Sequence, residues 1–308
     1  MNIYSIFDDF DSYAAETIRS AGVALTVHPL GVPRPDHDQM KDILEEYDGV
    51  IIGTSQIISE DMFDNISTPR IIATASVGLD HIRVPADKQT LVTVLNTPKA
   101  NAQSVAEYTM GCALSCVKRL REGNQLYLSG KNNKALRRKP EDLAGKTLGV
   151  VGAGNISVKI MEFARFFGME LLCWTRDPKR HAELPETYSV RFTDLETLCE
   201  SADLISVNLP NKPGTVGLIS AELVARMKEE AVFISISRAQ TLDLDALLQQ
   251  AETHPDFYLC LDLDPDPALT ARRLDLPNVL ITPHIAGGTV ESRKRMFREL
   301  AESIAEGN

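Results

Sequence analysis

A glycine-rich turn near the middle of the chain sets the strongest limit on the fold. The segment Val150-Val151-Gly152-Ala153-Gly154-Asn155-Ile156 follows a β-rich run and opens a helical pattern. Gly152 permits a tight turn, and Gly154 has no Cβ that would keep a pyrophosphate away from the backbone. The first amides of a helix then bind the anion. A turn without a ligand is the alternative. We expect a dinucleotide site at Gly152, Gly154, Asn155 and Ile156.

Short β-rich runs alternate with helical patterns in two series, one before and one after residue 145. In the first series we expect strands at Asn2–Phe7, Ala24–His28, Val50–Gly53, Arg70–Ala75 and Val92–Leu95, and helices at Asp11–Ser20, Asp36–Glu45 and Asp61–Ile66. In the second we expect strands at 148–151, Glu170–Trp174, Asp203–Asn208, Ala231–Ser235 and Phe257–Leu261, and a helix at Ile156–Phe167. Such alternation predicts parallel sheets with helices on both faces. The expected fold class is α/β, with two Rossmann-like domains: a flavodoxin-like substrate domain and a dinucleotide-binding domain.

The two series are joined by a long helical pattern at Ser104–Tyr127 and a polar, basic stretch at Ser129–Glu141, which we interpret as an exposed arm. Apolar residues at helical spacing also predict a helix at Val290–Ala305. We expect residues 1–99 and 285–308 to form the substrate domain and residues 100–284 the dinucleotide-binding domain. Two such units imply a cleft in which both enclose a ligand.

The composition limits the class of partner and the compartment. The 308 residues carry a formal net charge of -11, so we expect no nucleic acid partner, because phosphate binding needs clustered Lys and Arg. The five cysteines form no Cys-x-x-Cys pair and no zinc-like spacing with histidine, and we expect no metal. Neither a signal peptide nor an apolar run of the roughly 20 residues that span a bilayer is visible. We expect a cytoplasmic protein that binds no membrane.

The end of the second strand after the glycines selects between the two nicotinamide cofactors. An acidic residue there binds the ribose 2′-hydroxyl of NAD and repels the 2′-phosphate of NADP. The position holds Thr175, followed by Arg176, and a hydroxyl beside a guanidinium suits a phosphate. A shift of two residues would instead place Asp177 there and favour NAD. We expect NADP, with Thr175 and Arg176 among its ligands.

Three separated segments supply an arginine, a carboxylate and a histidine. They are Phe233-Ile-Ser-Ile-Ser-Arg238, Leu261-Asp262-Leu-Asp264-Pro-Asp266-Pro267 and Ile281-Thr-Pro-His284. Reduction of a 2-keto acid needs a cation that holds the carboxylate and polarises the carbonyl, and an acid that protonates the forming alkoxide. A carboxylate keeps that acid charged and oriented. The set predicts an oxidoreductase.

Together with Ser76-Val-Gly-Leu-Asp80 and Asn96-Thr-Pro-Lys-Ala-Asn-Ala-Gln-Ser-Val-Ala-Glu107, these segments follow one another in a familiar order. Over essentially its whole length the chain resembles the D-isomer-specific 2-hydroxyacid dehydrogenases. The resemblance implies that His284 is the general acid/base and Arg238 the residue that binds substrate and polarises its carbonyl. It implies that the backbone amides of Val77 and Gly78 bind the substrate carboxylate, and that Asp262 accepts from the nicotinamide amide. Further residues implied or expected at the site are Asn101 near the substrate, and Leu209, Pro210, Thr215 and Ser237 beside the cofactor.

The carboxylate segment departs from the family pattern. Asp266-Pro267 stands where the family usually has Glu-Pro, and the stretch from Asp262 is one residue short. We expect Asp266 to be the partner of His284, with Asp264 as the alternative. Ala239 also replaces a usual glycine, and the strand end at 52–54 lacks an arginine often found there, which argues against a phosphorylated substrate. Each residue also has a non-catalytic alternative. Arg238 would be a surface ion-pair residue, Asp266 a turn residue and His284 a helix cap.

The sequence thus predicts an enzyme that transfers a hydride between NAD(P)H and a small 2-keto acid or D-2-hydroxy acid of the glyoxylate or hydroxypyruvate type. Another D-2-hydroxyacid dehydrogenase, such as the phosphoglycerate type, is one alternative. A non-catalytic NAD(P)-sensing protein like the C-terminal-binding corepressors is the other. Because the Ser104–Tyr127 segment matches the region through which relatives dimerise, we expect a homodimer.

Overall fold

The computed structural model describes residues 1–271 and 276–307, which form two compact units. Unit 1 comprises Met1–Asn101 and Thr289–Asn308, and unit 2 comprises Ala102–Gly288. These boundaries lie two and four residues further along the chain than we expected. The first falls where a helix of unit 2 begins at Ala102. The second falls at Thr289, whose side chain caps the final helix by accepting from Ser292 N, so the turn that carries His284 belongs to unit 2.

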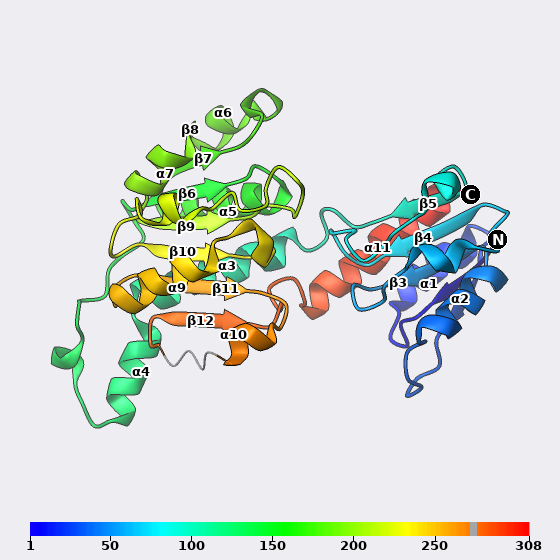
Figure 1. The fold of residues 1–308 in the computed structure, drawn as a ribbon, viewed down its shortest axis with the longest axis horizontal. Helices are drawn as coiled ribbons and strands as arrows, with labels where there is room; N and C mark the ends of the chain where they lie inside the picture. The colour runs from blue at the N-terminus through cyan, green and yellow to red at the C-terminus, as the bar shows by residue number, and fades with distance from the viewer. Residues whose placement is uncertain (272–275, 308) are drawn as a thin grey trace. The chain divides into compact units, whose positions relative to one another are not determined.

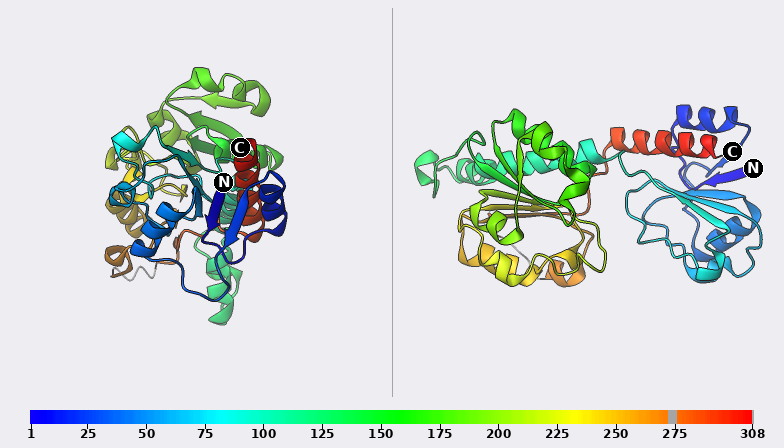
Figure 2. Two further views of the ribbon diagram at one scale, coloured as in Figure 1. Left: turned by 90° about the vertical axis from the view of Figure 1, so that its right-hand side faces the viewer. Right: turned by 90° about the horizontal axis from the view of Figure 1, so that it is seen from above.

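Unit 1 is built on a parallel sheet in the order β2-β1-β3-β4-β5 (Figure 1). The strands are β1 (Asn2–Ser5), β2 (Ala24–Val27), β3 (Gly49–Ile52), β4 (Arg70–Thr74) and β5 (Val92–Leu95), with helices α1 (Ser12–Ser20), α2 (His37–Glu46) and α11 (Val290–Glu306) and 3₁₀ turns η1 (Glu60–Phe63) and η2 (Ala86–Lys88). This is the flavodoxin-like strand order. Helices α1 and α11 lie side by side on one face (Figure 2). The helix expected at Asp61–Ile66 is instead the short η1.

Unit 2 contains a parallel sheet in the order β12-β11-β10-β9-β6-β7-β8. The strands are β6 (Thr147–Val151), β7 (Glu170–Trp174), β8 (Val190–Phe192), β9 (Leu204–Val207), β10 (Val232–Ser235), β11 (Tyr258–Asp262) and β12 (Val279–Thr282). The helices are α3 (Ala102–Val117), α4 (Leu120–Leu128), α5 (Asn155–Phe166), α6 (Leu184–Tyr188), α7 (Leu195–Ser201), α8 (Ala221–Val224), α9 (Leu244–Thr253) and α10 (Pro267–Ala271), with 3₁₀ turns η3 (Asn133–Ala135), η4 (Pro178–His181) and η5 (Ala239–Thr241). The order reverses between β6 and β9, and in such sheets ligands bind at the carboxyl ends of the strands beside this reversal.

Both faces of the unit 2 sheet are covered, which explains its nearly continuous apolar strands. Along β10, Phe233 packs in the core formed with α7, α8 and α9, whereas Val232 and Ile234 pack in the core formed with α3 and α5. The two helical layers are visible on opposite sides of this sheet in the right-hand view of Figure 2. The two-domain α/β prediction is confirmed.

The helix expected at Ser104–Tyr127 is two helices, α3 and α4, and the prediction of one continuous helix is wrong. Arg119 separates them in a left-handed conformation with φ 52°. Its side chain is only 5% exposed and donates to Glu122 (3.0 Å), Tyr258 (3.1 Å) and Asp256 (2.8 Å). Since Asp256 and Tyr258 lie more than a hundred residues away, tertiary contacts fix this break.

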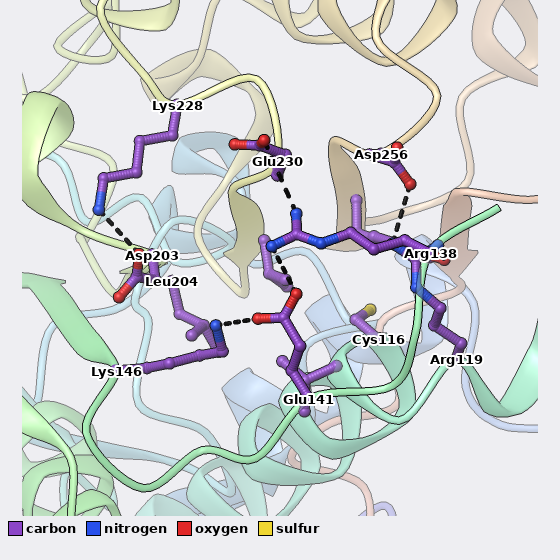
Figure 3. A pocket seen from close by; sticks show the side chains of 13 residues that line it. Cys116, Arg119, Arg138, Glu141, Lys146, Asp203, Leu204, Lys228, Glu230 and Asp256 are labelled. Atoms are coloured by element: carbon purple, nitrogen blue, oxygen red, sulfur yellow. Dashed lines mark hydrogen bonds and ion pairs between the residues drawn. The ribbon is translucent and has the colours of Figure 1, made fainter.

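A hollow opens at the amino-terminal edge of the same sheet (Figure 3). Its cations are bound by its own carboxylates: Lys228 to Asp203 (2.7 Å), Arg138 to Glu141 (2.5 Å) and, in the same network, Lys146 to Glu141 and Arg119 to Asp256. These charges compensate one another, and the last part of the expected arm is anchored here. The hollow is therefore a structural ion-pair network, whereas ligands of such sheets bind at the opposite, carboxyl-terminal edge.

Across the described ranges, every helix is too short or too polar to cross a bilayer.

Candidate active site

The glycine turn at the end of β6 has the geometry of a pyrophosphate cradle. Gly152 has φ 102°, and a Cβ placed on it would come 2.9 Å from the carbonyl oxygen of Asn208. Gly154 is the N-cap of α5 and supplies no side-chain cap. A Cβ built on Gly154 would meet no described atom within 4 Å, so the space beside it is open. These residues fit a dinucleotide, because the backbone is approachable and the first amides of α5 have no cap from Gly154.

The end of β7 lies beside this turn, since Gly152 N donates to the carbonyl of Trp174 (2.8 Å). Thr175 is half-buried and Arg176 is exposed. Arg176 donates to the carbonyl oxygen of Gly214 (3.0 Å). Asp177 pairs with Arg180 (3.2 Å). Thr175 therefore directly follows the residue that contacts the glycine turn, and the choice between NAD and NADP stays a prediction.

The loop after β9 is held by hydroxyl groups that we expected beside the cofactor. Ser237 accepts from Leu209 N (2.7 Å) and donates to the carbonyl of Val207 (3.0 Å). Thr215 donates to the carbonyl of Pro210 (2.6 Å). Ser237 and Thr215 are buried and their hydroxyls bind within the protein, so they fix the shape of the loop that carries Leu209 and Pro210.

Arg238, Asp264 and His284 come together because of the register of three neighbouring strands. Ser235 on β10 faces Leu261 on β11, and Asp262 faces Thr282 on β12. The same register carried beyond the strand ends places the three side chains at one level. His284 Nδ1 lies 2.6 Å from Asp264 Oδ1, and His284 Nε2 lies 3.4 Å from Arg238 Nη1. Because arginine only donates, Nε2 accepts in this arrangement and Nδ1–H donates to the carboxylate.

The prediction that Asp266 is the partner of His284 is therefore wrong. Asp266 Oδ1 accepts from Ala268 N (2.8 Å), so this side chain caps the start of α10. Asp264 instead directly follows Leu263, whose N donates to the carbonyl of Thr282 (3.0 Å) and continues the strand ladder. That ladder carries Asp264 toward His284 and leaves Asp266 in the next turn.

His284 sits on a turn whose backbone is held by a buried carboxylate. Its φ is 52°, a left-handed conformation that is uncommon for a residue with a Cβ. Asp262, 4% exposed, accepts from Thr282 Oγ1 (2.5 Å), Ile285 N (2.9 Å) and Ala286 N (2.8 Å). Asp262 thus braces the His284 turn, and its expected contact with the nicotinamide amide stays a prediction.

In unit 1, the loop after β4 leaves two adjacent amides without an acceptor in the described part of the chain. The carbonyls of Ser76, Val77 and Gly78 accept from Thr97 N (3.0 Å), Asn96 Nδ2 (2.8 Å) and Ser76 Oγ (2.8 Å), respectively. Within residues 1–271 and 276–307, the amides of Val77 and Gly78 have no hydrogen-bond partner. Adjacent amides of this kind form a site for a small anion.

Other groups support this part of unit 1. His81 Nε2 lies 2.9 Å from Thr74 Oγ1, which lies 2.9 Å from Ser76 Oγ, so a chain of side chains braces the loop. Asn101 ends this part of unit 1, and its amide oxygen is buried without a hydrogen-bond partner in the described part of the chain. An unpaired buried acceptor is costly, and it marks Asn101 as a residue with an unfilled contact.

Comparison with known proteins identifies the family of this chain. Residues 110–286 match the family model described as D-isomer specific 2-hydroxyacid dehydrogenase, NAD binding domain. The chain belongs to this family. The dehydrogenase is 34% identical to hydroxypyruvate reductase of Thermotoga maritima, over 87% of each chain. It is 32% identical to D-3-phosphoglycerate dehydrogenase of Synechocystis, where the match covers 85% of this chain and 47% of that relative.

Solved structures agree with this placement. The TT0316 protein of Thermus thermophilus superposes with a TM-score of 0.81 at 28% identity, covering 100% of this chain and 98% of that one. The protein is thus an NAD(P)-linked 2-hydroxyacid dehydrogenase, in which a nicotinamide cofactor, when bound, would supply or remove the hydride at carbon 2 of the substrate.

Sequence reasoning missed some of the groups that shape the site. Thr282 was quoted only as part of a motif, although its place two residues before His284 could have marked it as a bracing residue. Tyr108, whose hydroxyl lies 2.6 Å from Thr282 Oγ1, lies on α3 far away in sequence. For Tyr108 no local signal exists, because only the fold brings it to β12.

Proposed function

We propose that this dehydrogenase reduces glyoxylate, hydroxypyruvate or a similarly small 2-keto acid to the D-2-hydroxy acid. The proposal depends on the alignment of Arg238, His284 and Asp264 at the carboxyl edge of one sheet. His284 Nε2 lies 3.4 Å from Arg238 Nη1, and His284 Nδ1 lies 2.6 Å from Asp264 Oδ1. The name of the Thermotoga maritima relative, hydroxypyruvate reductase, supports the substrate class.

Each residue of the set has a role that its chemistry allows. In its protonated form His284 gives the Nε2 proton to the carbonyl oxygen, and Asp264 at Nδ1 orients the ring and stabilises its charged form. Arg238 holds the carboxylate and polarises the carbonyl from the side of Nε2. The unpaired amides of Val77 and Gly78 suit the substrate carboxylate, and the buried oxygen of Asn101 suits a donor on the substrate.

The residues expected at the cofactor form the second part of the proposal. The pyrophosphate is held at the start of α5 by Gly152, Gly154, Asn155 and Ile156. Leu209 and Pro210 lie beside the cofactor. The loop that carries Leu209 and Pro210 is kept in place by Thr215 and Ser237. We assign the acceptor of the nicotinamide amide to Asp262. Thr175 and Arg176 favour NADP, because the exposed guanidinium at the end of β7 suits a 2′-phosphate.

The cofactor preference is tested by kcat/KM for NADPH and NADH. We expect a preference for NADPH that falls about tenfold in Arg176→Ala, which removes one charge-assisted hydrogen bond. Arg180→Ala is the matched control, since Arg180 is exposed and paired with Asp177. A strong preference of the wild type for NADH would show that the assignment of Thr175 and Arg176 is wrong.

We also propose that the protein is a homodimer. On α4 the structure describes no buried residue, and Leu120, Tyr127 and Leu128 are 59%, 80% and 76% exposed. Large apolar side chains gathered on one helix are typical of a protein interface. Sedimentation equilibrium should give a dimer, and Leu120→Glu with Leu128→Glu should weaken it. A wild-type monomer at micromolar concentration would contradict the proposal.

A cytoplasmic location without nucleic acid partners completes the proposal. Its support is the set of free, buried cysteines and the net charge of -11.

The substrate proposal is tested with a panel of 2-keto acids, including glyoxylate, hydroxypyruvate and phosphohydroxypyruvate, while nicotinamide oxidation is followed. We expect the highest kcat/KM with glyoxylate or hydroxypyruvate. Preference for the phosphorylated acid would favour the phosphoglycerate type. Turnover of none would favour the corepressor-like alternative, which the altered carboxylate segment keeps open. The 2.6 Å contact of Asp264 with His284 Nδ1 argues against that alternative.

A further inference from the structure

A directed chain of hydrogen bonds runs from α3 to the His284 turn. Tyr108 Oη lies 2.6 Å from Thr282 Oγ1, and Thr282 Oγ1 donates to Asp262 Oδ1 (2.5 Å). A hydroxyl has one hydrogen, and an ionised carboxylate only accepts. The hydrogen of Thr282 is therefore used on Asp262, so Tyr108 must be the donor to Thr282.

The far end of this chain is the backbone that carries His284. Asp262 accepts from Ile285 N and Ala286 N, the two amides that follow His284. His284 N donates to the carbonyl of Thr282 (3.0 Å). The left-handed conformation of His284 is thus held before His284 by the backbone carbonyl of Thr282 and after it by the Asp262 carboxylate. The Thr282 hydroxyl contacts the same carboxylate. Strained conformations of this kind persist only where the surroundings fix them.

Tyr108 strengthens the hydrogen bond from Thr282 to Asp262. By donating to Thr282 Oγ1 it occupies a lone pair of that oxygen, and hydrogen bonds in such a chain strengthen one another. Without this donor the hydrogen bond from Thr282 to Asp262 is weaker, and the turn that Asp262 braces is held less firmly. Burial raises the pKa of Tyr108, so its hydroxyl keeps its proton at neutral pH.

We propose that Tyr108 is a positioning residue of the dehydrogenase: through Thr282 and Asp262 it holds the left-handed turn that keeps His284 against Asp264 and Arg238. The inference rests on the proposed role of His284 as the acid. It adds a residue of another element, α3, to the machinery that aligns that acid.

The first test is Tyr108→Phe, which removes only the hydroxyl. Loss of one hydrogen bond predicts a kcat about fivefold lower, with KM for the keto acid and for the nicotinamide cofactor changed less than about twofold. Thr282→Val should cause a similar or larger loss, and Thr282→Ser, which keeps the hydroxyl, should restore most of kcat. In the double variant Tyr108→Phe with Thr282→Val, the loss should match that of Thr282→Val alone.

The matched control is Tyr258→Phe. Tyr258 is a buried tyrosine of unit 2, whereas Tyr108 is half-buried. The Tyr258 hydroxyl accepts from Arg119 Nη1 (3.1 Å) at the amino-terminal edge of the sheet. We expect its kcat to equal that of the wild type. Equal losses in both tyrosine variants, or an unchanged kcat in Tyr108→Phe, would overturn the proposal.

Hydrogen exchange gives a readout that needs no turnover. If Tyr108 holds the turn, the amides of Ile285 and Ala286 should exchange about fivefold faster in Tyr108→Phe and at wild-type rates in Tyr258→Phe. Faster exchange in a protein that reduces no keto acid would uphold the positioning of the turn and reject the proposed function. Unchanged exchange in an active enzyme would reject the positioning role alone.

Discussion

Replacement of Asp264 by Asn tests the pairing that the structure assigns to His284. Asp264 Oδ1 lies 2.6 Å from His284 Nδ1. The substitution keeps the size of the side chain but removes the negative charge that stabilises the protonated ring. Hydrogen bonds to charged groups contribute about 1.5–3 kcal/mol. Because the Asp264 side chain is 68% exposed, solvent screening favours the lower end, about 1.5–2 kcal/mol, which corresponds to a kcat about 10- to 30-fold lower.

Asp266→Asn is the matched control in the same loop. Its side chain accepts from Ala268 N, and the amide oxygen of asparagine can keep that bond. Its kcat should stay within about twofold of the wild type. Both variants should be assayed by nicotinamide oxidation at saturating keto acid and cofactor, with Kd for the cofactor measured by fluorescence to show that binding is intact. If Asp266→Asn loses as much activity as Asp264→Asn, or more, the assigned pairing is wrong.

Further predictions concern the acid, the cradle and the ion-pair network. His284→Ala should lower kcat at least about a hundredfold while the Kd of the cofactor changes little; survival of turnover within a few-fold would remove His284 as the acid. Gly152→Ala introduces a Cβ into the tight approach at φ 102° and should raise the Kd of the cofactor at least about tenfold, whereas unaltered titrations would place the pyrophosphate elsewhere. Burial opposes ionisation of Asp203, but hydrogen bonds from Lys228 and the Thr147 amide hold its pKa below the ordinary value. A lowered carboxyl pKa stabilises the fold above the ordinary pKa, and this contribution is lost as the pH falls through the lowered value. The Tm deficit of Asp203→Asn should therefore be full at pH 7 and shrink below about pH 4; a deficit independent of pH would refute the ionic origin.

Much of the fold was predictable because it depends on local pattern. The alternating runs predicted both parallel sheets, and the limits of β5 and β7 agree with the sequence expectation. β8 (Val190–Phe192) and β12 (Val279–Thr282) escaped prediction, since runs of three or four residues are too short to show a strand period. The break at Arg119 escaped for a different reason: arginine is a good helix former, and only distant partners such as Asp256 hold it in a left-handed conformation.

In the candidate site, too, some residues could be predicted from local sequence and others depend on contacts between distant segments. Arg238 and His284 could be selected from the sequence because each follows a short apolar run and each has a side chain that the chemistry requires. The carboxylate could not, since Asp264 and Asp266 both precede a proline. The choice depends on the pairing of β11 with β12, which aligns Asp262 with Thr282 and so carries Asp264 to His284. Register between strands is a tertiary property, and no single segment encodes it.

The proposed reduction requires that Arg238 and His284 act on one and the same carbonyl group. A crystal structure with NADPH and oxamate, a 2-keto acid mimic that is not reduced, tests this most directly. We predict that the Arg238 guanidinium and His284 Nε2 both lie within about 2.6–3.2 Å of the ligand's carbonyl or carboxylate oxygens, with Asp264 still on Nδ1. Oxamate bound with either side chain turned into solvent would contradict the account.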